Sequence, residues 1–374
     1  MPLVSVLLPT YSRNASNYLR NAIMSVLEQD MRDLELFVID DGSVDGSAET
    51  IAEIASMDPR LHHVRFEENV GLPALTCGEA FRRSQGEFIA WQFDDCVWKP
   101  DLLSSLIKVA RDNPDSGMVY GQAEMNAGDS TSIFGEIFDR EVLKQRNIIP
   151  NCSTLIKREV FLTAGWLDPS VILKRICDYD MWIRAAEHFE ITFLEKVVAV
   201  ENGLSLPDSL GNSVTLMSSL AKKYREQDRT TYLNIDNIEA WNPYAASEWM
   251  DDLEKEQVAQ LVCEHLLRTK KYAKAVSTVC ELLPNKFGSM VNGESGSDAR
   301  LTENVLAWYI DKLNEQRQKR EKEAQEHIRR QDQYIVDQHA YIERQHQMIY
   351  ELQARVPEKD LSRWSAFKRV LSIR

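Results

Sequence analysis

The chain has 374 residues, more than one typical domain, and a formal net charge of −14. This acidity argues against a nucleic-acid partner, because phosphate backbones are bound by basic surfaces. Six cysteines without CxxC spacing, no N-terminal signal peptide and no apolar run of about eighteen residues favour a cytoplasmic protein without membrane-spanning helices.

The N-terminal part alternates short apolar runs with segments of helical spacing. An apolar run that ends in turn-forming residues indicates a buried strand, and strand, helix, strand in succession indicates a parallel βαβ unit. The pattern predicts strands at 4–8, 34–39 and 63–66, a further strand ending at Asp94, and helices at 18–27 and 73–84.

Polar residues follow three of these strands. Pro9 to Tyr11 follow the first, Asp40 and Asp41 the second, and Asp94 and Asp95 the last. The carboxyl ends of strands in an α/β sheet open onto its ligand site, so these residues would meet at one edge of the sheet. That arrangement predicts a nucleotide pocket.

The segment FIAWQFDDCVWKP, residues 88–100, places two carboxylates side by side. Adjacent carboxylates repel each other unless a cation, a hydroxyl donor or water accompanies them. A divalent ion held by one or two carboxylates is a usual way for a protein to bind a diphosphate. A solvated surface turn is the alternative interpretation.

Six segments are each a weak signal alone, but their order along the chain is specific. They are VSVLLPTYSR, SVLEQ, FVIDDGSVDGS, ENVGLPAL, GEFIAWQFDDCVWKP and GWLDPSVILKRICDYDMWIR. With them the chain resembles glycosyltransferase family 2, the inverting enzymes of the GT-A fold. The resemblance covers roughly residues 1–205 and implies an α/β fold, a Rossmann-like, mostly parallel sheet flanked by helices. It also implies a nucleotide-sugar donor and a Mn²⁺ or Mg²⁺ cofactor.

The resemblance assigns roles to the strand-end residues. Pro9, Thr10 and Tyr11 would cradle the base and ribose, and Asp41 would accept from a uracil or thymine imide while Asp40 holds the turn or assists. Asp94 would be a ribose or metal-water partner, and Asp95 the direct metal ligand. All seven residues lie in the first, third and fifth of these segments.

Asp178 matches the family's general base, which takes the acceptor's proton in a single in-line displacement. Arg175 would contact the diphosphate or orient the base, although a surface arginine is equally compatible. Acids also favour first helical turns, so Asp178 or Asp180 could instead cap the helix DYDMWIRAAEHF. We favour catalysis for Asp178 and capping for Asp180.

The chain departs from the family pattern at three places, which puts parts of the site in doubt. Phe93 stands where an Asp is commoner, Leu75 and Thr76 replace a basic residue and an asparagine, and Cys177 replaces a glutamate. These departures leave an alternative interpretation, in which the chain is an inactive GT-A domain that acts as a coiled-coil scaffold. A nucleotidyltransferase is a further alternative, but PTYSRNAS supplies no glycine for a phosphate loop.

Residues 206–300 are predicted to be a helical accessory region. A linker or flexible loop at 206–213 precedes a helical hairpin over 247–283, with a cap at Ser247 and a turn near 268–272, and 286–298 read as a loop. The hairpin resembles one tetratricopeptide-like unit, and one unit is not an array.

Residues 301–356 form one long charged helical pattern. Ile328, Ile335, Ile342, Ile349 and Val356 recur every seven residues, which is coiled-coil spacing and favours a homo-oligomer over a single solvated helix. The tail, 357–374, has a basic amphipathic pattern over 361–374. That pattern suits an anionic membrane surface or a helix lying on the enzyme itself.

Together these features predict an inverting, metal-dependent and non-processive glycosyltransferase. It would move one sugar from a nucleotide-sugar, UDP favoured, to a glycan or lipid-linked glycan acceptor. Family habit and the basic tail place it in bacterial surface polysaccharide synthesis, in the cytoplasm or peripherally on the inner face of the membrane.

Overall fold

The computed structural model describes residues 1–333 except 129, 175, 203–218, 230–232, 292–299, 320, 323–324, 327 and 331–332. The chain divides into one unit, Met1–Thr302, and a second unit that begins at Glu303. The predicted linker at 206–213 lies outside the described residues.

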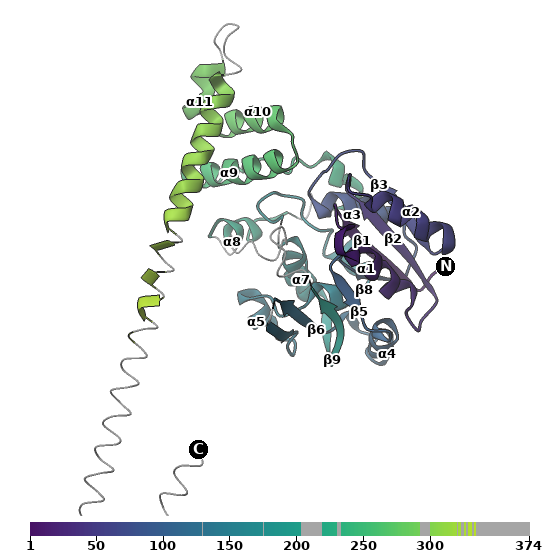
Figure 1. Cartoon of the computed structure of the whole chain (residues 1–374). Helices are drawn as coiled ribbons and strands as arrows, with labels where there is room; N and C mark the ends of the chain where they lie inside the picture. The colour runs from purple at the N-terminus through teal and green to yellow at the C-terminus, as the bar shows by residue number, and fades with distance from the viewer. Residues whose placement is uncertain are drawn as a thin grey trace, which may run out of the picture. The chain divides into compact units, whose positions relative to one another are not determined.

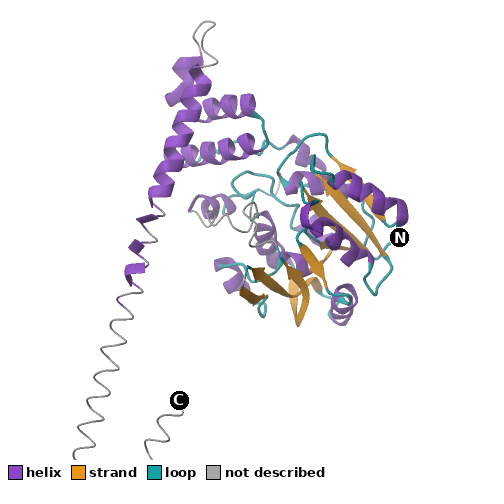
Figure 2. Ribbon diagram, in the orientation of Figure 1, coloured by secondary structure: helices purple, strands orange, loops and turns teal. Residues whose placement is uncertain are grey.

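The first unit is built on one mixed sheet with helices on both faces (Figures 1 and 2). The strand order is β3-β2-β1-β4-β8-β6-β9-β5, with β7 paired to β6. The strands are β1 (Val4–Thr10), β2 (Leu34–Asp40), β3 (Leu61–Arg65), β4 (Phe88–Trp91), β5 (Cys96–Trp98), β6 (Ser116–Ala127), β7 (Ser130–Phe134), β8 (Thr154–Lys157) and β9 (Glu190–Glu201).

The predicted α/β fold is therefore confirmed, and its parallel part is the segment that the sequence indicates. Strands β3, β2, β1 and β4 run parallel, whereas β8 pairs antiparallel with both β4 and β6. The helices of this part are α1 (Tyr18–Leu27), α2 (Ser47–Met57), α3 (Pro73–Arg83), α4 (Leu102–Asp112), α5 (Arg140–Gln145), α6 (Arg158–Thr163) and α7 (Cys177–His188).

Helices cover both faces because the central strands are apolar on both sides. Successive side chains of a strand point to opposite faces. Leu7 of β1 packs in one cluster with Cys77 of α3 and Trp182 of α7. Leu8 packs in the other, with Leu19 of α1. Two such layers leave the carboxyl ends of the strands as the place where polar side chains gather.

The accessory region contributes α8 (Ser219–Arg225), α9 (Asp252–Arg268), α10 (Tyr272–Leu282) and α11 (Pro284–Val291). Helices α9 and α10 form the predicted hairpin, with its turn after Arg268 (Figure 1). Two details of the prediction were wrong. The cap is Asp251, which forms a capping box with Glu254, rather than Ser247. Residues 286–291 continue a helix because Pro284 starts α11 there.

A buried ion cluster ties the accessory region to α7 and to the loop that precedes it. The Arg229 guanidinium donates to the Asp168 carboxylate at 2.6 Å and to Asp180 Oδ1 at 2.8 Å. All three side chains are at most 6% exposed. Arg184 Nε donates to Asp180 Oδ2 at 3.0 Å. Asp180 therefore serves this cluster instead of capping its helix, whose N-cap residue is Ile176.

Arg229→Ala is expected to lower the free energy of unfolding by about 3–5 kcal/mol, because it leaves two buried carboxylates without their shared cation. Arg20→Ala is the matched control, since Arg20 pairs with Glu53 at the surface and its loss should cost less than about 1 kcal/mol. Urea unfolding of both variants measures the difference. Equal losses would mean that the buried cluster contributes no more than a surface pair.

In the second unit, residues 303–319 are helical. Ile328 is 56% exposed, and the other heptad residues, from Ile335 to Val356, lie outside the described residues, as does the 357–374 tail. The coiled coil and the membrane-binding tail remain predictions. Within the part of the chain that the structure describes, no helix combines the length and apolarity needed to cross a bilayer.

Candidate functional site

A cavity of about 350 Å³ opens where the carboxyl ends of β1, β2 and β4 meet the start of α7 and the end of α9. It brings together seven of the predicted site residues: Pro9, Thr10, Tyr11, Asp41, Asp94, Asp95 and Asp178. Phe93 and Cys177, two of the departures from the family pattern, also line it. Arg175 lies outside the described residues.

Asp41 anchors one wall of the cavity. Its carboxylate accepts from the backbone N–H of Val70 at 2.8 Å and of Gly71 at 2.7 Å. Burial nevertheless raises the pKa of Asp41 above its usual range. Gly71 has φ +66°, and a Cβ added there would lie 2.9 Å from His265 Cε1 of α9. This loop therefore requires glycine, both for its backbone conformation and for the closeness of α9.

Asp40 lies behind this wall and is not among the described residues that line the cavity. Its carboxylate is fully buried and accepts from the backbone N–H of Ser43 at 2.8 Å. His63 Nε2 lies 3.8 Å from it. Burial would raise the pKa of Asp40, but the nearby His63 and the hydrogen bonds from Ser43 outweigh it and hold this pKa below its usual range. These contacts suit the turn-holding role.

Asp94 and Asp95 lie in the turn between β4 and β5, since β4 ends at Trp91. Buried Gln92 holds this turn: its Nε2 donates to the Cys96 carbonyl at 3.1 Å and its Oε1 accepts from Phe93 N–H at 3.1 Å. Burial and the neighbouring Asp95 raise the pKa of Asp94 to about 7, although Arg13 opposes the shift. Arg13 Nε lies 3.6 Å from Asp94 Oδ1.

Asp178 stands in the first turn of α7, and its Oδ1 accepts from the Tyr179 N–H at 2.8 Å. Burial raises the pKa of Asp178 to about 6, while this backbone bond and the Asn151 amide lower it. A carboxylate with a pKa near 6 is mostly ionised at neutral pH and still basic enough to accept a proton. Its environment therefore suits general-base chemistry.

Glu201, at the end of β9, is a cavity residue that the sequence analysis missed. Burial raises its pKa to about 7, and the charges of Asp95 and Asp178 add to the shift. The available signal was an apolar run, Val197 to Val200, that ends in an acid.

Three cationic side chains that the sequence analysis did not select also line the cavity: Arg13, Lys174 and Arg268. Arg13 follows β1, Lys174 precedes α7, and Arg268 ends α9. Arg268 and its neighbour Thr269 belong to the accessory region, which thus forms part of the cavity. Cations beside a nucleotide pocket are suited to binding a diphosphate.

The residues fit a hard divalent cation. Asp94, Asp95, Asp178 and Glu201 line one cavity, and the pKa is raised at Asp94, Asp178 and Glu201. Carboxylates so placed repel one another, and a cation with oxygen ligands, such as Mg²⁺ or Mn²⁺, would relieve that repulsion. The Asp95 carbonyl accepts from Asn202 N–H at 3.0 Å, so β9 holds Asp95 in place.

Comparison with known proteins gives a family match at residues 5–161, to the model of glycosyl transferase family 2. An uncharacterized glycosyltransferase of Rickettsia prowazekii is 31% identical over 210 residues, covering 53% of this chain and 63% of the relative. TuaG of Bacillus subtilis, a candidate teichuronic acid biosynthesis glycosyltransferase, is 33% identical over 163 residues, 42% of this chain. The chain spans 63% of that relative too.

Solved structures give a weaker likeness. The TarS 1–349 structure from S. aureus aligns with a TM-score of 0.47 at 16% identity, covering 76% of this chain and 81% of that one. A mannosyltransferase from Pyrobaculum calidifontis, in complex with GDP-Man and Mn²⁺, aligns with a TM-score of 0.43 at 19% identity. That alignment covers 82% of this chain and 80% of the mannosyltransferase.

Proposed function

We propose that the chain moves one sugar from a nucleotide-sugar to an acceptor hydroxyl, as a member of glycosyl transferase family 2, whose model matches residues 5–161. The donor is a UDP-sugar in the favoured case, the acceptor is a glycan or lipid-linked glycan, and the anomeric carbon is inverted. One observation carries the proposal. A single cavity holds the acids of the β4–β5 turn, the half-buried Asp178 and three cationic side chains.

The donor is bound along the ends of β1 and β2. Pro9, Thr10 and Tyr11 contact the base and ribose, and Asp41 accepts from the base imide with lone pairs that its two backbone bonds leave available. Arg13, Lys174 and Arg268 contact the diphosphate. Asp95 would hold a Mg²⁺ or Mn²⁺ ion, with Asp94 beside it, and such an ion would supply positive charge next to the departing diphosphate.

Asp178 acts on the acceptor. It removes the proton from the attacking hydroxyl as the new glycosidic bond forms and the bond to the diphosphate breaks. Partial desolvation raises the pKa of the Asp178 carboxyl and so keeps the carboxylate basic. The Asn151 amide and the Tyr179 N–H orient this carboxylate. Leu167 and Trp91 supply apolar walls near the reacting atoms, which exclude competing water.

A thermal-unfolding screen of the full chain against UDP-, GDP-, dTDP- and CMP-sugars, with and without Mn²⁺, tests the donor assignment. A ligand that binds the folded state alone adds about 2.7 kcal/mol at a hundred times its dissociation constant. We expect UDP-sugars to stabilise the chain most, and more with Mn²⁺. Stabilisation by none of them would favour the inactive scaffold.

The pKa of Asp178, raised to about 6 by burial, predicts a pH dependence of catalysis. A general base works when deprotonated, so kcat should fall about tenfold per pH unit below 6 and level off above it. Initial rates at saturating donor and Mn²⁺ isolate this step from donor binding. In Asp178→Asn this decrease of kcat at acidic pH should disappear. If the decrease persisted, the titrating group would be a residue other than Asp178.

We place the enzyme in polysaccharide synthesis, because one of its relatives, TuaG, is named for teichuronic acid biosynthesis. We place the enzyme in the cytoplasm or at the inner membrane face, assembled as a homo-oligomer through residues 301–356 and attached to anionic lipid through 361–374. These last assignments rest on sequence pattern.

A further inference from the structure

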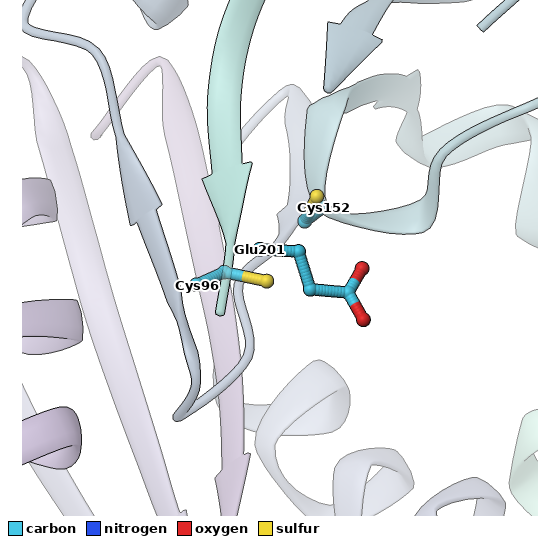
Figure 3. Close-up of side chains that lie close together, drawn as sticks. All are labelled: Cys96, Cys152 and Glu201. Carbon is cyan, nitrogen blue, oxygen red and sulfur yellow. The ribbon is translucent and has the colours of Figure 1, made fainter. Parts of the chain in front are cut away.

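Two thiols and a carboxylate meet at the edge of the cavity (Figure 3). Cys96 begins β5, Cys152 lies in the 3₁₀ turn Asn151–Ser153, and Glu201 ends β9. Their two sulfurs and a carboxylate oxygen all lie within 4.8 Å of one another. All six cysteines of the chain are free buried thiols, so neither sulfur is committed to a disulfide.

The backbone fixes these three residues relative to one another. Cys96 pairs directly with Glu201 across the β5–β9 ladder. The Trp98 indole N–H donates to the Cys152 carbonyl at 2.8 Å, which joins the 3₁₀ turn to the same strand. Ligands on rigid elements need little rearrangement when an ion binds.

The chemistry of this group differs from that of the neighbouring acids. Thiolates select Zn²⁺ and similar soft ions, whereas carboxylates suit Mg²⁺ and Mn²⁺. Tetrahedral zinc, with Zn–S of about 2.3 Å and Zn–O of about 2.0–2.2 Å, places its ligand atoms roughly 3.5–3.8 Å apart. The three atoms, at most 4.8 Å apart, need to close by no more than roughly 1.3 Å, within reach of small side-chain rotations. Cys152 and Glu201 also line the cavity, which supplies an entry path and room for a fourth ligand.

We propose that Cys96, Cys152 and Glu201 form a second cation site, selective for a soft divalent ion such as Zn²⁺, and that an ion bound there opposes binding of the donor's ion at Asp95. Two cysteine protons leave as the two metal–sulfur bonds form, and water takes the fourth position. The Cys96 thiol lies 3.7 Å from Asp95 Oδ1 and donates to it, so metallation removes that donor and places a positive ion beside Asp95. The inhibitory part rests on the proposed function, and the binding part does not.

Binding is tested by titrating the metal-free full chain with Co²⁺ under anaerobic conditions. We expect one equivalent to give sulfur-to-cobalt charge-transfer absorption and visible bands of a tetrahedral site. One equivalent of Zn²⁺ should remove these bands, and a large excess of Mg²⁺ should leave them. Absence of the charge-transfer band would overturn the proposal. So would the loss of two of the six thiols, counted in denaturant, because that loss would show a disulfide.

Variants assign the ligands. Cys96→Ser and Cys152→Ser should each weaken Co²⁺ binding by at least 10–100-fold, roughly the loss seen for residues that only support a metal's ligands. Glu201→Gln should keep the charge-transfer band and weaken binding. Cys280→Ser is the matched control, since Cys280 is buried in α10 and away from the cavity. Unchanged binding in both Cys96→Ser and Cys152→Ser, with native thermal unfolding, would overturn the site.

The inhibitory consequence has its own measurement. Calorimetry of donor binding in Mg²⁺ should show at least tenfold weaker binding when one equivalent of Zn²⁺ is present, and no such effect in Cys152→Ser. Donor binding that ignores Zn²⁺ in a chain with a proven cobalt site would overturn the coupling. Failure of the donor to bind at all, with the cobalt bands intact, would instead count against the proposed function.

Discussion

Asp178→Asn should lower kcat by about 10²–10⁴-fold while the dissociation constant of the donor changes little. The substitution keeps the size of the side chain and its bond from Tyr179 but removes the proton acceptor. Because the acceptor hydroxyl must lose its proton as it attacks, the loss falls on the chemical step. Single-turnover rates at saturating donor, with calorimetry for donor affinity, separate the two effects.

Asp115→Asn is the matched control for this variant, since Asp115 is an exposed acid remote from the cavity. It should leave both quantities unchanged. The interpretation of Asp178 as a base would be wrong if its Asn variant lost donor binding but kept a nearly normal rate at saturation. Asp178 would then belong to the donor site or to the structure of α7.

Asp95→Ala should abolish the metal dependence of donor binding and weaken that binding at least 10–100-fold in Mn²⁺. Asp95 lies in the β4–β5 turn, where its carbonyl bond from Asn202 survives the substitution. Its carboxylate is the oxygen ligand that the proposed ion needs. Calorimetry with UDP-sugar, with and without Mn²⁺, measures both predictions.

The fold should tolerate Asp95→Ala, because a turn carboxylate contributes little to the apolar core. The midpoint of unfolding should therefore stay unchanged while the metal-dependent binding of the donor is lost. A variant that still binds the donor more tightly with Mn²⁺ would remove Asp95 from the metal site. Comparing the two variants separates donor binding, expected to depend on Asp95, from proton transfer, expected to depend on Asp178.

The sequence was most informative for the first hundred residues or so. Apolar runs such as Val4–Leu8 can only be buried strands of a parallel unit, and the polar residues that follow them must then meet at one edge of the sheet. Hence six candidate site residues that line one cavity could be named from local pattern alone, namely Pro9, Thr10, Tyr11, Asp41, Asp94 and Asp95. Asp178, which also lines it, was named from the family resemblance. A residue buried behind the site, such as Asp40, follows the same pattern and cannot be separated from them without the structure.

Only the tertiary structure decided what surrounds those residues. Glu201 approaches Cys96 because β9 pairs with β5, a contact between positions about a hundred residues apart that no local pattern encodes. Arg268 reaches the cavity because α9 packs against the Gly71 loop. The raised pKa of Asp178 comes from burial, which depends on the whole packing of the sheet and α7. Residue types and their order were thus set locally, whereas desolvation and long-range pairing, which determine the chemistry of the site, exist only in the folded chain.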